Sequence, residues 1–479
     1  MRNSIKKNYI YNLIYQILVI ILPIITTPYI SRVLGAENIG IYSYTTSISA
    51  YFILFGSLGI NLYAQREIAY HQDNKKKNSK TFFEIVILRD ITMLISIIIF
   101  FIAFGTSGEY GFFYKILIIE LIAQCFDISW FFSGLEEFKK TVLRNLVVKC
   151  TSVIAIFLLV KTPDDLYIYF LIYVLSAFIG NISLWFYLPK YIIKVKLKEI
   201  NIVKHLKPTL ALFIPEIAIQ VYTILDKTMI GAIWEDKSEV GYYQQSERVI
   251  KLLLTIITSL GTVLLPRVAN CFANNKKQQV FEYIKKSFNY VYFLAFPMIF
   301  GIIVVANKFV PMFFGPGYDR VIILMSIISP IILFIGMSNV IGKQYLLPTK
   351  RQKQYTISVI IGAIINFAVN SCLIWKYGAL GASLGTVIAE FSVTLVQIIF
   401  VRKEFNVKEI LKLSLNYLIS SVVMFIICKL VGFIHVSDLV SIVLQIGIGV
   451  IIYIALLLVL KDKFTYNMIK QIKEKIFKI

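Results

Sequence analysis

The sequence predicts an all-α, polytopic membrane protein with about fourteen transmembrane helices, and two observations predict this class. The chain has 479 residues, of which 58% are hydrophobic and only 16% are charged. Globular domains are about 45–50% apolar and about 25% charged. The apolar residues also form blocks of roughly 18–24 residues separated by short polar gaps, and a bilayer core about 30 Å thick requires about 20 apolar residues per helix.

The predicted spans alternate with short polar gaps along the whole chain. Because their number is even, both termini are expected on the same side of the membrane. No gap is long enough to form a soluble domain, so the function is expected to lie within the membrane. The predicted spans are residues 9–30, 41–62, 83–104, 112–132, 142–160, 167–188, 209–232, 242–265, 287–306, 321–342, 355–375, 379–400, 413–433 and 438–460.

Basic residues in the gaps predict which side of the membrane each gap faces. Every second gap, beginning with the N-terminal segment, is rich in Lys and Arg, with about 36 in total against about seven in the remaining gaps. Positive charge resists translocation, so the basic side, which carries both termini, is predicted to be cytoplasmic. The net charge of +22 is therefore explained by topology and does not indicate nucleic-acid binding.

An internal repeat predicts two halves of six helices each. Because the repeat carries the first span onto the seventh, its unit contains an even number of spans and keeps its orientation in the membrane. We predict an N-terminal lobe (1–207) and a C-terminal lobe (208–412) around a central cavity, followed by two more helices and a basic tail (413–479). A shift of 201 residues aligns Gly40, Tyr42, Arg66 and Asn74–Lys76 with Gly241, Tyr243, Arg267 and Asn275–Lys277.

Charged residues inside the predicted spans are candidates for contacts with a substrate or an ion, because inserting one costs about 2.5–3.5 kcal/mol. Residues adjacent in a helix point in different directions, so Arg89 with Asp90, and Asp226 with Lys227, are expected to pair poorly. Each charge could instead form a structural ion pair or extend to the interface. The candidate cations for an anionic substrate are Arg89, Lys227, Arg248 and Lys251; the candidate carboxylates for proton or sodium coupling are Glu120, Asp127, Asp226 and Glu390.

The sequence carries no signature of an enzyme, a cofactor or a metal site. It lacks the Gly-rich loop ending in GK[ST] that binds nucleotide phosphates. Its three histidines, His71, His205 and His435, lie near span ends, and its five cysteines form no CxxC pair. Asp164 and Asp165 lie in a loop of a few residues, which we interpret as a polar turn. We therefore expect a protein without catalytic activity.

Five segments of the chain, taken in order, resemble a known group of transporters. They are "PYISRVLGAENIGIYSY", "GINLYAQREIA", "FDISWFFSGLEEFKKTVLRNLVVK", "LDKTMIGAIWEDKSEVGYYQQSERVIK" and "NFAVNSCLIWKYGALGASLGTVIAE". The sequence resembles the Wzx-type oligosaccharide flippases (O-antigen, capsule and exopolysaccharide repeat units). These belong to the polysaccharide transport family of the multidrug/oligosaccharidyl-lipid/polysaccharide exporter superfamily.

The resemblance implies a substrate, a location and several functional positions. The implied substrate is an oligosaccharide linked to undecaprenyl diphosphate, moved by alternating access to the outer leaflet of the bacterial cytoplasmic membrane. Membrane lipids and other polysaccharide-assembly membrane proteins are the implied partners. The positions that match the family pattern are Arg32, Arg66, Trp130, Asp226 and Gly241, whereas Lys227 has no place in it. Arg32 and Arg66 therefore join the candidate substrate-binding cations.

Three other functions stay open from the sequence. A drug/cation antiporter of the same superfamily would need a cavity dominated by carboxylates, whereas the candidates here include many cations. A lipid II flippase would use the same physical chemistry with another head group. A membrane glycan polymerase or glycosyltransferase would need a large outward loop with acid and base residues, and the sequence has none.

Overall fold

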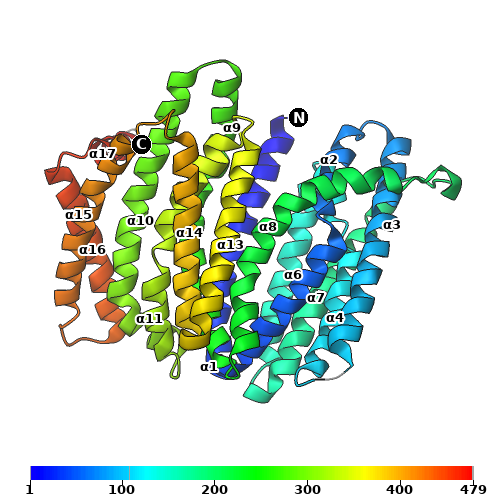
Figure 1. Cartoon of the computed structure of the whole chain (residues 1–479), viewed down its shortest axis with the longest axis horizontal. Helices are drawn as coiled ribbons and strands as arrows, with labels where there is room; N and C mark the ends of the chain where they lie inside the picture. Colours follow the sequence, from blue (N-terminus) through cyan, green and yellow to red (C-terminus); the bar gives the residue numbers. More distant parts are fainter. Residues whose placement is uncertain (1, 107, 477–479) are drawn as a thin grey trace. The chain divides into compact units, whose positions relative to one another are not determined.

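The computed structural model describes the backbone of residues 2–106 and 108–476, and the side chains of these residues except 2–17, 19, 20, 197, 214–216, 218, 219, 260, 262, 263, 472, 475 and 476. Every regular element in this part is helical, as Figure 1 shows, which confirms the predicted all-α class. Among the described residues, twelve helical stretches are long and apolar enough to cross a membrane. The chain is a multi-pass membrane protein.

The first predicted span and most of the second lie in one helix, α1 (Arg2–Ser57), which is interrupted at Gly35. Gly35 has φ 77° and ψ 172°, a conformation that glycine adopts without steric cost and other residues rarely do. The predicted spans 9–30 and 41–62 fall on the two sides of this break. The predicted seventh span, 209–232, falls within α8 (Val203–Ile233). The total of fourteen spans stays a prediction.

The chain divides into two compact units, Met1–Gly241 and Tyr242–Ile479, called unit 1 and unit 2 below. In unit 1, α1 packs against α3, α4, α6 and α8, and α4 packs against α7. The lobe boundaries predicted at residues 207 and 412 stay a prediction. The other helices of unit 1 are α2 (Ile60–Tyr70), α3 (Lys75–Phe100), η1 (Phe101–Gly105), α4 (Gly111–Cys125), α5 (Ser129–Gly134), α6 (Phe138–Leu159), η2 (Pro163–Asp165), α7 (Leu166–Trp185), η3 (Leu188–Lys190) and η4 (Leu197–Glu199).

Unit 2 is built around the long helix α10, which packs against α11, α12, α15 and α16, while α13 packs against α14. The turn between α9 and α10 projects beyond the neighbouring ends of α13 and α14 (Figure 1). The helices of unit 2 are α9 (Ser238–Ala273, which begins in unit 1), α10 (Lys277–Phe314), α11 (Asp319–Ile328), α12 (Ile331–Ser338), η5 (Asn339–Leu346), α13 (Gln352–Tyr377), α14 (Ala379–Val401), α15 (Val407–Val431), α16 (Asp438–Val459) and α17 (Lys463–Ile476).

Helix α16 shows why these units suit lipid better than water. Its buried face carries Ser441 and Gln445, whereas Val443 is 62% and Ile451 is 68% exposed. The buried Gln445 donates through Nε2 to the carbonyl oxygen of Cys428 on α15, at 3.1 Å. Polar groups therefore join the helices and large apolar side chains cover the outside, which is the arrangement a hydrocarbon solvent favours.

Candidate functional site

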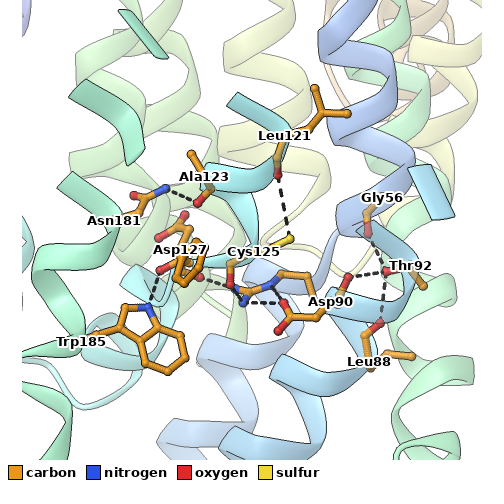
Figure 2. A network of polar contacts seen from close by, with 12 residues as sticks. Gly56, Leu88, Asp90, Thr92, Leu121, Ala123, Cys125, Asp127, Asn181 and Trp185 are labelled. Atoms are coloured by element: carbon orange, nitrogen blue, oxygen red, sulfur yellow. Dashed lines mark hydrogen bonds and ion pairs between the residues drawn. The ribbon is translucent and has the colours of Figure 1, made fainter. Parts of the chain in front are cut away.

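Arg89, on α3, is buried and holds the end of α4. Its side chain is 3% exposed, and its Nε and Nη2 atoms donate to Asp90 Oδ1 at 3.1 and 3.0 Å. Nη1 donates to the carbonyl oxygen of Asp127 at 2.5 Å, and Nη2 also donates to that of Cys125. Figure 2 shows Asp90 and these carbonyl groups together. A cation here complements the negative end of the helix dipole.

The expectation that Arg89 and Asp90 pair poorly was wrong. Although their Cα–Cβ bonds diverge, the Arg89 side chain is long enough to bring its guanidinium back to the Asp90 carboxylate. The ion pair and the two carbonyl groups engage all three nitrogens of the guanidinium. These contacts favour a structural role for Arg89, and we leave it out of the proposed substrate contacts.

Other side chains complete the junction between α4 and α5. From α7, Asn181 Nδ2 donates to the carbonyl oxygen of Ala123 at 2.7 Å, and Trp185 Nε1 donates to that of Phe126 at 2.8 Å (Figure 2). Asp127 Oδ1 accepts from the backbone N–H of Ser129, two residues further on, at 2.8 Å, which forms a local turn just before α5. The carboxylate of Asp127 therefore serves the local fold, and its contacts give no support to ion coupling.

Glu120 is a candidate carboxylate that is buried between two hydroxyl groups. It lies on α4 and is 8% exposed. Its Oε2 accepts from Ser49 Oγ of α1 at 3.1 Å, and its Oε1 accepts from Tyr173 OH of α7 at 2.8 Å. Neither partner is charged, so protonation would break no ion pair with a described residue. Tyr173 is 40% exposed and connects the buried carboxyl to a surface of unit 1.

Asp226 and Lys227 lie on α8 where this helix packs against α1. Asp226 is 3% exposed, and Lys227 is half-buried. The next residue, Thr228, shares a hydrogen bond of 2.8 Å with Ser47 of α1 and lies 3.4 Å from Tyr51 OH. The contact between α1 and α8 is therefore polar, and both charges lie beside it. Their predicted roles stay proposals.

The candidates of unit 2 lie on α9 and α14. Lys251 Nζ pairs with Glu247 Oε1 at 2.6 Å, one helical turn away on α9, and the Lys251 side chain is 46% exposed. Arg248 is half-buried on the same helix. Glu390 is 8% exposed on α14, which α9 contacts through a hydrogen bond of 3.0 Å between Tyr243 OH and Thr386 Oγ1.

Three of the positions carried over from the resemblance differ in burial: two are exposed and one lies in the core. Arg32 and Arg66 are exposed on α1 and α2. The Arg66 guanidinium pairs with Glu67 at 3.4 Å and lies over the ring of Tyr63, 5.6 Å from its centroid. Trp130 is instead buried in the core, with 3% exposure. Packing therefore accounts for a large aromatic residue at this position.

A contact between glycines 201 residues apart was missed from the sequence, although the repeat supplied the signal. A Cβ atom on Gly40 would lie 1.7 Å from the carbonyl oxygen of Lys237, and one on Gly241 would lie 2.0 Å from that of Ala36. The same shift of 201 relates Ala36 to Lys237. The contact is therefore reciprocal, as at a two-fold axis, and only glycine permits the approach of α1 to the start of α9.

A buried carboxylate, Glu84, was also missed because it lies at the edge of a predicted span. Its side chain is fully buried on α3, and its Oε2 lies 3.0 Å from His205 Nε2 and 2.8 Å from Lys204 Nζ. Oε1 accepts from the backbone N–H of Asn201 at 2.8 Å. His205 Nδ1 lies 2.7 Å from Tyr63 OH, so the cluster joins α2, α3 and the start of α8.

Each unit also carries an apolar groove. In unit 1 a groove of about 450 Å³ lies between α1 and α3, and two of its hydroxyl groups, those of Thr92 and Ser96, donate to backbone carbonyls of α1 at 2.6 Å. In unit 2 a groove of about 580 Å³ is lined mainly by α10, α15 and α16. Its walls include Pro297, Gly301 and Tyr453. No group of His, Cys, Asp and Glu among the described residues could hold a metal ion.

The sequence profile of the polysaccharide biosynthesis protein family matches residues 5–272, more than half of the chain. The chain belongs to the polysaccharide biosynthesis protein family. The profile of the lipid II flippase MurJ matches residues 146–452 and overlaps the first match. These two matches confirm the predicted relationship to the Wzx-type flippases and to their exporter superfamily.

Relatives of this family member cover most of its length. It is 26% identical over 404 residues to a protein of Escherichia coli (strain K12) whose name describes an O-antigen transporter, and the match covers 83% of this chain and 97% of the relative. It is 24% identical over 394 residues to the capsular polysaccharide biosynthesis protein CapF of Staphylococcus aureus, covering 80% and 96%.

Two solved structures share the fold. The lipid II flippase MurJ in an inward closed conformation superposes with a TM-score of 0.76 at 20% identity, covering 96% of this chain and all of that one. An inward-facing multidrug resistance MATE family transporter superposes with a TM-score of 0.60 at 10% identity, covering 82% and 99%. At such identities the likeness concerns the fold alone.

Proposed function

We propose that this protein is a flippase that moves lipid-linked oligosaccharide repeat units across the membrane for synthesis of a surface polysaccharide. The observation that carries the proposal is the apolar groove of unit 2, of about 580 Å³, between α10, α15 and α16. A carrier of small water-soluble molecules needs no such groove, whereas a lipid-linked substrate must keep its hydrocarbon tail in apolar surroundings. The family and the names of the relatives support the same substrate class.

The physical task explains why a protein is needed. A repeat unit carries many hydroxyl groups, and each one costs several kcal/mol when it enters hydrocarbon without a hydrogen-bond partner. A hydrated passage through the protein would remove this cost, and alternation between inward-open and outward-open states would keep the membrane sealed. In our proposal the tail stays in lipid and in the groove while the sugar crosses. This is transport, and it requires no catalytic residue and no cofactor.

We assign the diphosphate of an undecaprenyl-diphosphate carrier to half-buried cations. Arg and Lys hold phosphate through charge-assisted hydrogen bonds. Lys227 of unit 1 and Arg248 of unit 2 are half-buried on long helices and are our first choices. Lys251 is a weaker choice because its side chain is 46% exposed, and Arg32 and Arg66 are exposed as well. Arg32 and Arg66 would act before the diphosphate binds, by attracting the anion to the protein.

Ion coupling, where it occurs, is assigned first to Glu120, with Asp226 and Glu390 as the other buried candidates. An inside-negative potential alone favours outward movement of an anion, by about 2.3 kcal/mol per charge per 100 mV. Coupling is therefore not required by energetics. We place the protein in the bacterial cytoplasmic membrane with both termini inside, where the basic gaps would face the cytoplasm.

The test is a flipping assay in proteoliposomes with fluorescent undecaprenyl-diphosphate oligosaccharides. We expect Arg248→Ala and Lys227→Ala each to lower the rate about tenfold or more, because a hydrogen bond to a charged group contributes about 1.5–3 kcal/mol. Arg402→Ala, at an exposed arginine just after α14, is the matched control. Undiminished flipping in both variants would reject the cation assignment, and no flipping of any lipid-linked oligosaccharide would reject the function.

Lipid II is a second candidate substrate, favoured by the MurJ profile over residues 146–452. The same assay with lipid II decides between the two. Faster transport of lipid II than of any lipid-linked oligosaccharide would assign the protein to peptidoglycan synthesis instead.

A further inference from the structure

A hollow of about 530 Å³ in unit 2, lined by both charged and apolar side chains, has no role in the proposed transport. It lies where three segments meet: the start of α10, the segment between η5 and α13, and the segment after α14. These segments belong to three different gaps that the charge distribution predicts to be cytoplasmic. The residues that concern us are Lys277, Phe281, Tyr345, Arg351, Lys403 and Glu404.

The hollow carries an excess of positive charge. Its one carboxylate, Glu404, already accepts two hydrogen bonds from Arg351 Nη1, at 2.6 and 2.5 Å, and one from Tyr345 OH. Arg351 Nη2 also donates to the carbonyl oxygen of Phe400 at 3.0 Å. This pair is neutral as a whole. Lys277 and Lys403 form no ion pair with a described residue, so two positive charges are left over.

The walls of the hollow suit the head group of a lipid. Lys277 is the first residue of α10, whose first turn has no side-chain cap and therefore favours an anion nearby. Phe272, Val280 and Phe281 provide an apolar side to the same hollow. A site with two exposed ammonium groups beside apolar walls, at the ends of membrane helices, matches a phosphate ester that is anchored in lipid.

We propose that this hollow binds the phosphate head group of an anionic phospholipid that stays with the protein and is not transported. The lysines attract the phosphate, and the lipid links the start of α10 to the ends of α13 and α14 through its head group. A volume of about 530 Å³ is within the range of about 300–1,000 Å³ that small-ligand sites occupy. The proposal does not depend on the identity of the transported substrate.

The test is native mass spectrometry of the full chain, purified in detergent and titrated with phosphatidylglycerol or phosphatidylcholine. We expect the wild type to retain one phosphatidylglycerol tightly, and the double variant Lys277→Gln/Lys403→Gln to bind this first lipid about 30-fold more weakly, since a basic residue near a lipid phosphate contributes about 1 kcal/mol. Lys285→Gln is the matched control, because Lys285 lies in the adjoining hollow but pairs with Glu409 at 2.5 Å.

Competition separates the sources of phosphate. Inorganic phosphate at millimolar concentration should not displace the bound phosphatidylglycerol; displacement would show a site for free phosphate and overturn the proposal. Preferential retention of undecaprenyl phosphate would assign the hollow to the transported lipid and overturn it as well. Equal phosphatidylglycerol binding by the wild type and the double variant, with both folded by circular dichroism, would place the lipid elsewhere.

Discussion

Two carboxylates each link a pair of helices near a predicted cytoplasmic helix end, but they differ in burial. They are Glu84 in unit 1 and Glu404 in unit 2. Glu84 ties the start of α8 to α3, and its side chain is fully buried. Glu404 ties the start of α13 to the end of α14 through Arg351, and its side chain is 35% exposed. Both have several hydrogen-bond partners, so the number of contacts does not distinguish them. Burial distinguishes them, because it decides whether water can solvate the charge that is left when a partner is lost.

The comparison teaches where the stability of each unit is concentrated. Removing one member of a buried ion cluster leaves the other charge without water or partner, whereas an exposed pair is replaced by hydration. Substitutions around Glu84 should therefore affect unit 1 much more than equivalent substitutions around Glu404 affect unit 2. Four measurements test this difference, from the largest expected effect to the smallest.

The largest effect is expected for Glu84→Ala. The change leaves His205, Lys204 and the backbone N–H of Asn201 without their shared acceptor, and breaking a buried ion pair costs about 3–5 kcal/mol. Thermal unfolding in detergent should show a large decrease in midpoint relative to the wild type. Glu404→Ala is the matched variant in unit 2. A decrease for Glu84→Ala no larger than that of Glu404→Ala would break the comparison.

Gly40→Ala separates tight backbone packing from buried charge as a source of stability in unit 1. Because the new Cβ would lie 1.7 Å from the Lys237 carbonyl oxygen, the helices must move apart, and overpacking costs about 1–3 kcal/mol. Gly241→Ala should act alike, since its Cβ would meet Ala36 in the same way. Gly301→Ala, where a Cβ meets nothing within 4 Å, is the control and should unfold like the wild type. Unchanged unfolding midpoints for both Gly40→Ala and Gly241→Ala would contradict the reciprocal contact.

His205→Ala sharpens the comparison by removing one partner of Glu84 and keeping the Glu84 charge. Tyr63 OH and Glu84 each lose a hydrogen bond, and a buried group left unsatisfied costs about 1–3 kcal/mol. Lys204→Ala is the comparison variant. Because the Lys204 side chain is 45% exposed, its loss should reduce the free energy of unfolding less. Unfolding midpoints that rank Lys204→Ala as the more damaging change would show that Coulombic attraction, and not burial, sets the strength of the cluster.

The smallest effect is expected for the Arg351–Glu404 pair. A double-mutant cycle with Arg351→Ala and Glu404→Ala should give a coupling free energy of about 0–1 kcal/mol, the usual value for an exposed ion pair. Both carboxylate oxygens accept from the same Nη1 atom, so the pair lacks the two parallel hydrogen bonds that strengthen a bidentate pair. Raising the salt concentration should reduce the coupling further. A coupling above that of the Glu84–His205 pair would reverse the order drawn here.

Much of the fold follows from the sequence because the membrane imposes it. Blocks of apolar residues long enough to cross a bilayer must be helical, since no water satisfies their backbone groups. The all-α class followed from this constraint, and the predicted span 379–400 falls within α14, Ala379–Val401. The repeat of 201 residues was visible in the chain, and it relates the two glycines that meet where α1 crosses the start of α9.

The partners of the charges were decided by tertiary structure alone. Because Arg89 and Asp90 are adjacent on a helix, the sequence indicated that their Cα–Cβ bonds diverge. It did not indicate that the backbone carbonyls of Cys125 and Asp127 would lie beside the Arg89 guanidinium. The same holds for Glu120, whose hydroxyl partners come from residues 49 and 173. Hydropathy reports the cost of placing a charge in the membrane. Which group offsets that cost depends on helices brought together by packing, and only the folded chain determines it.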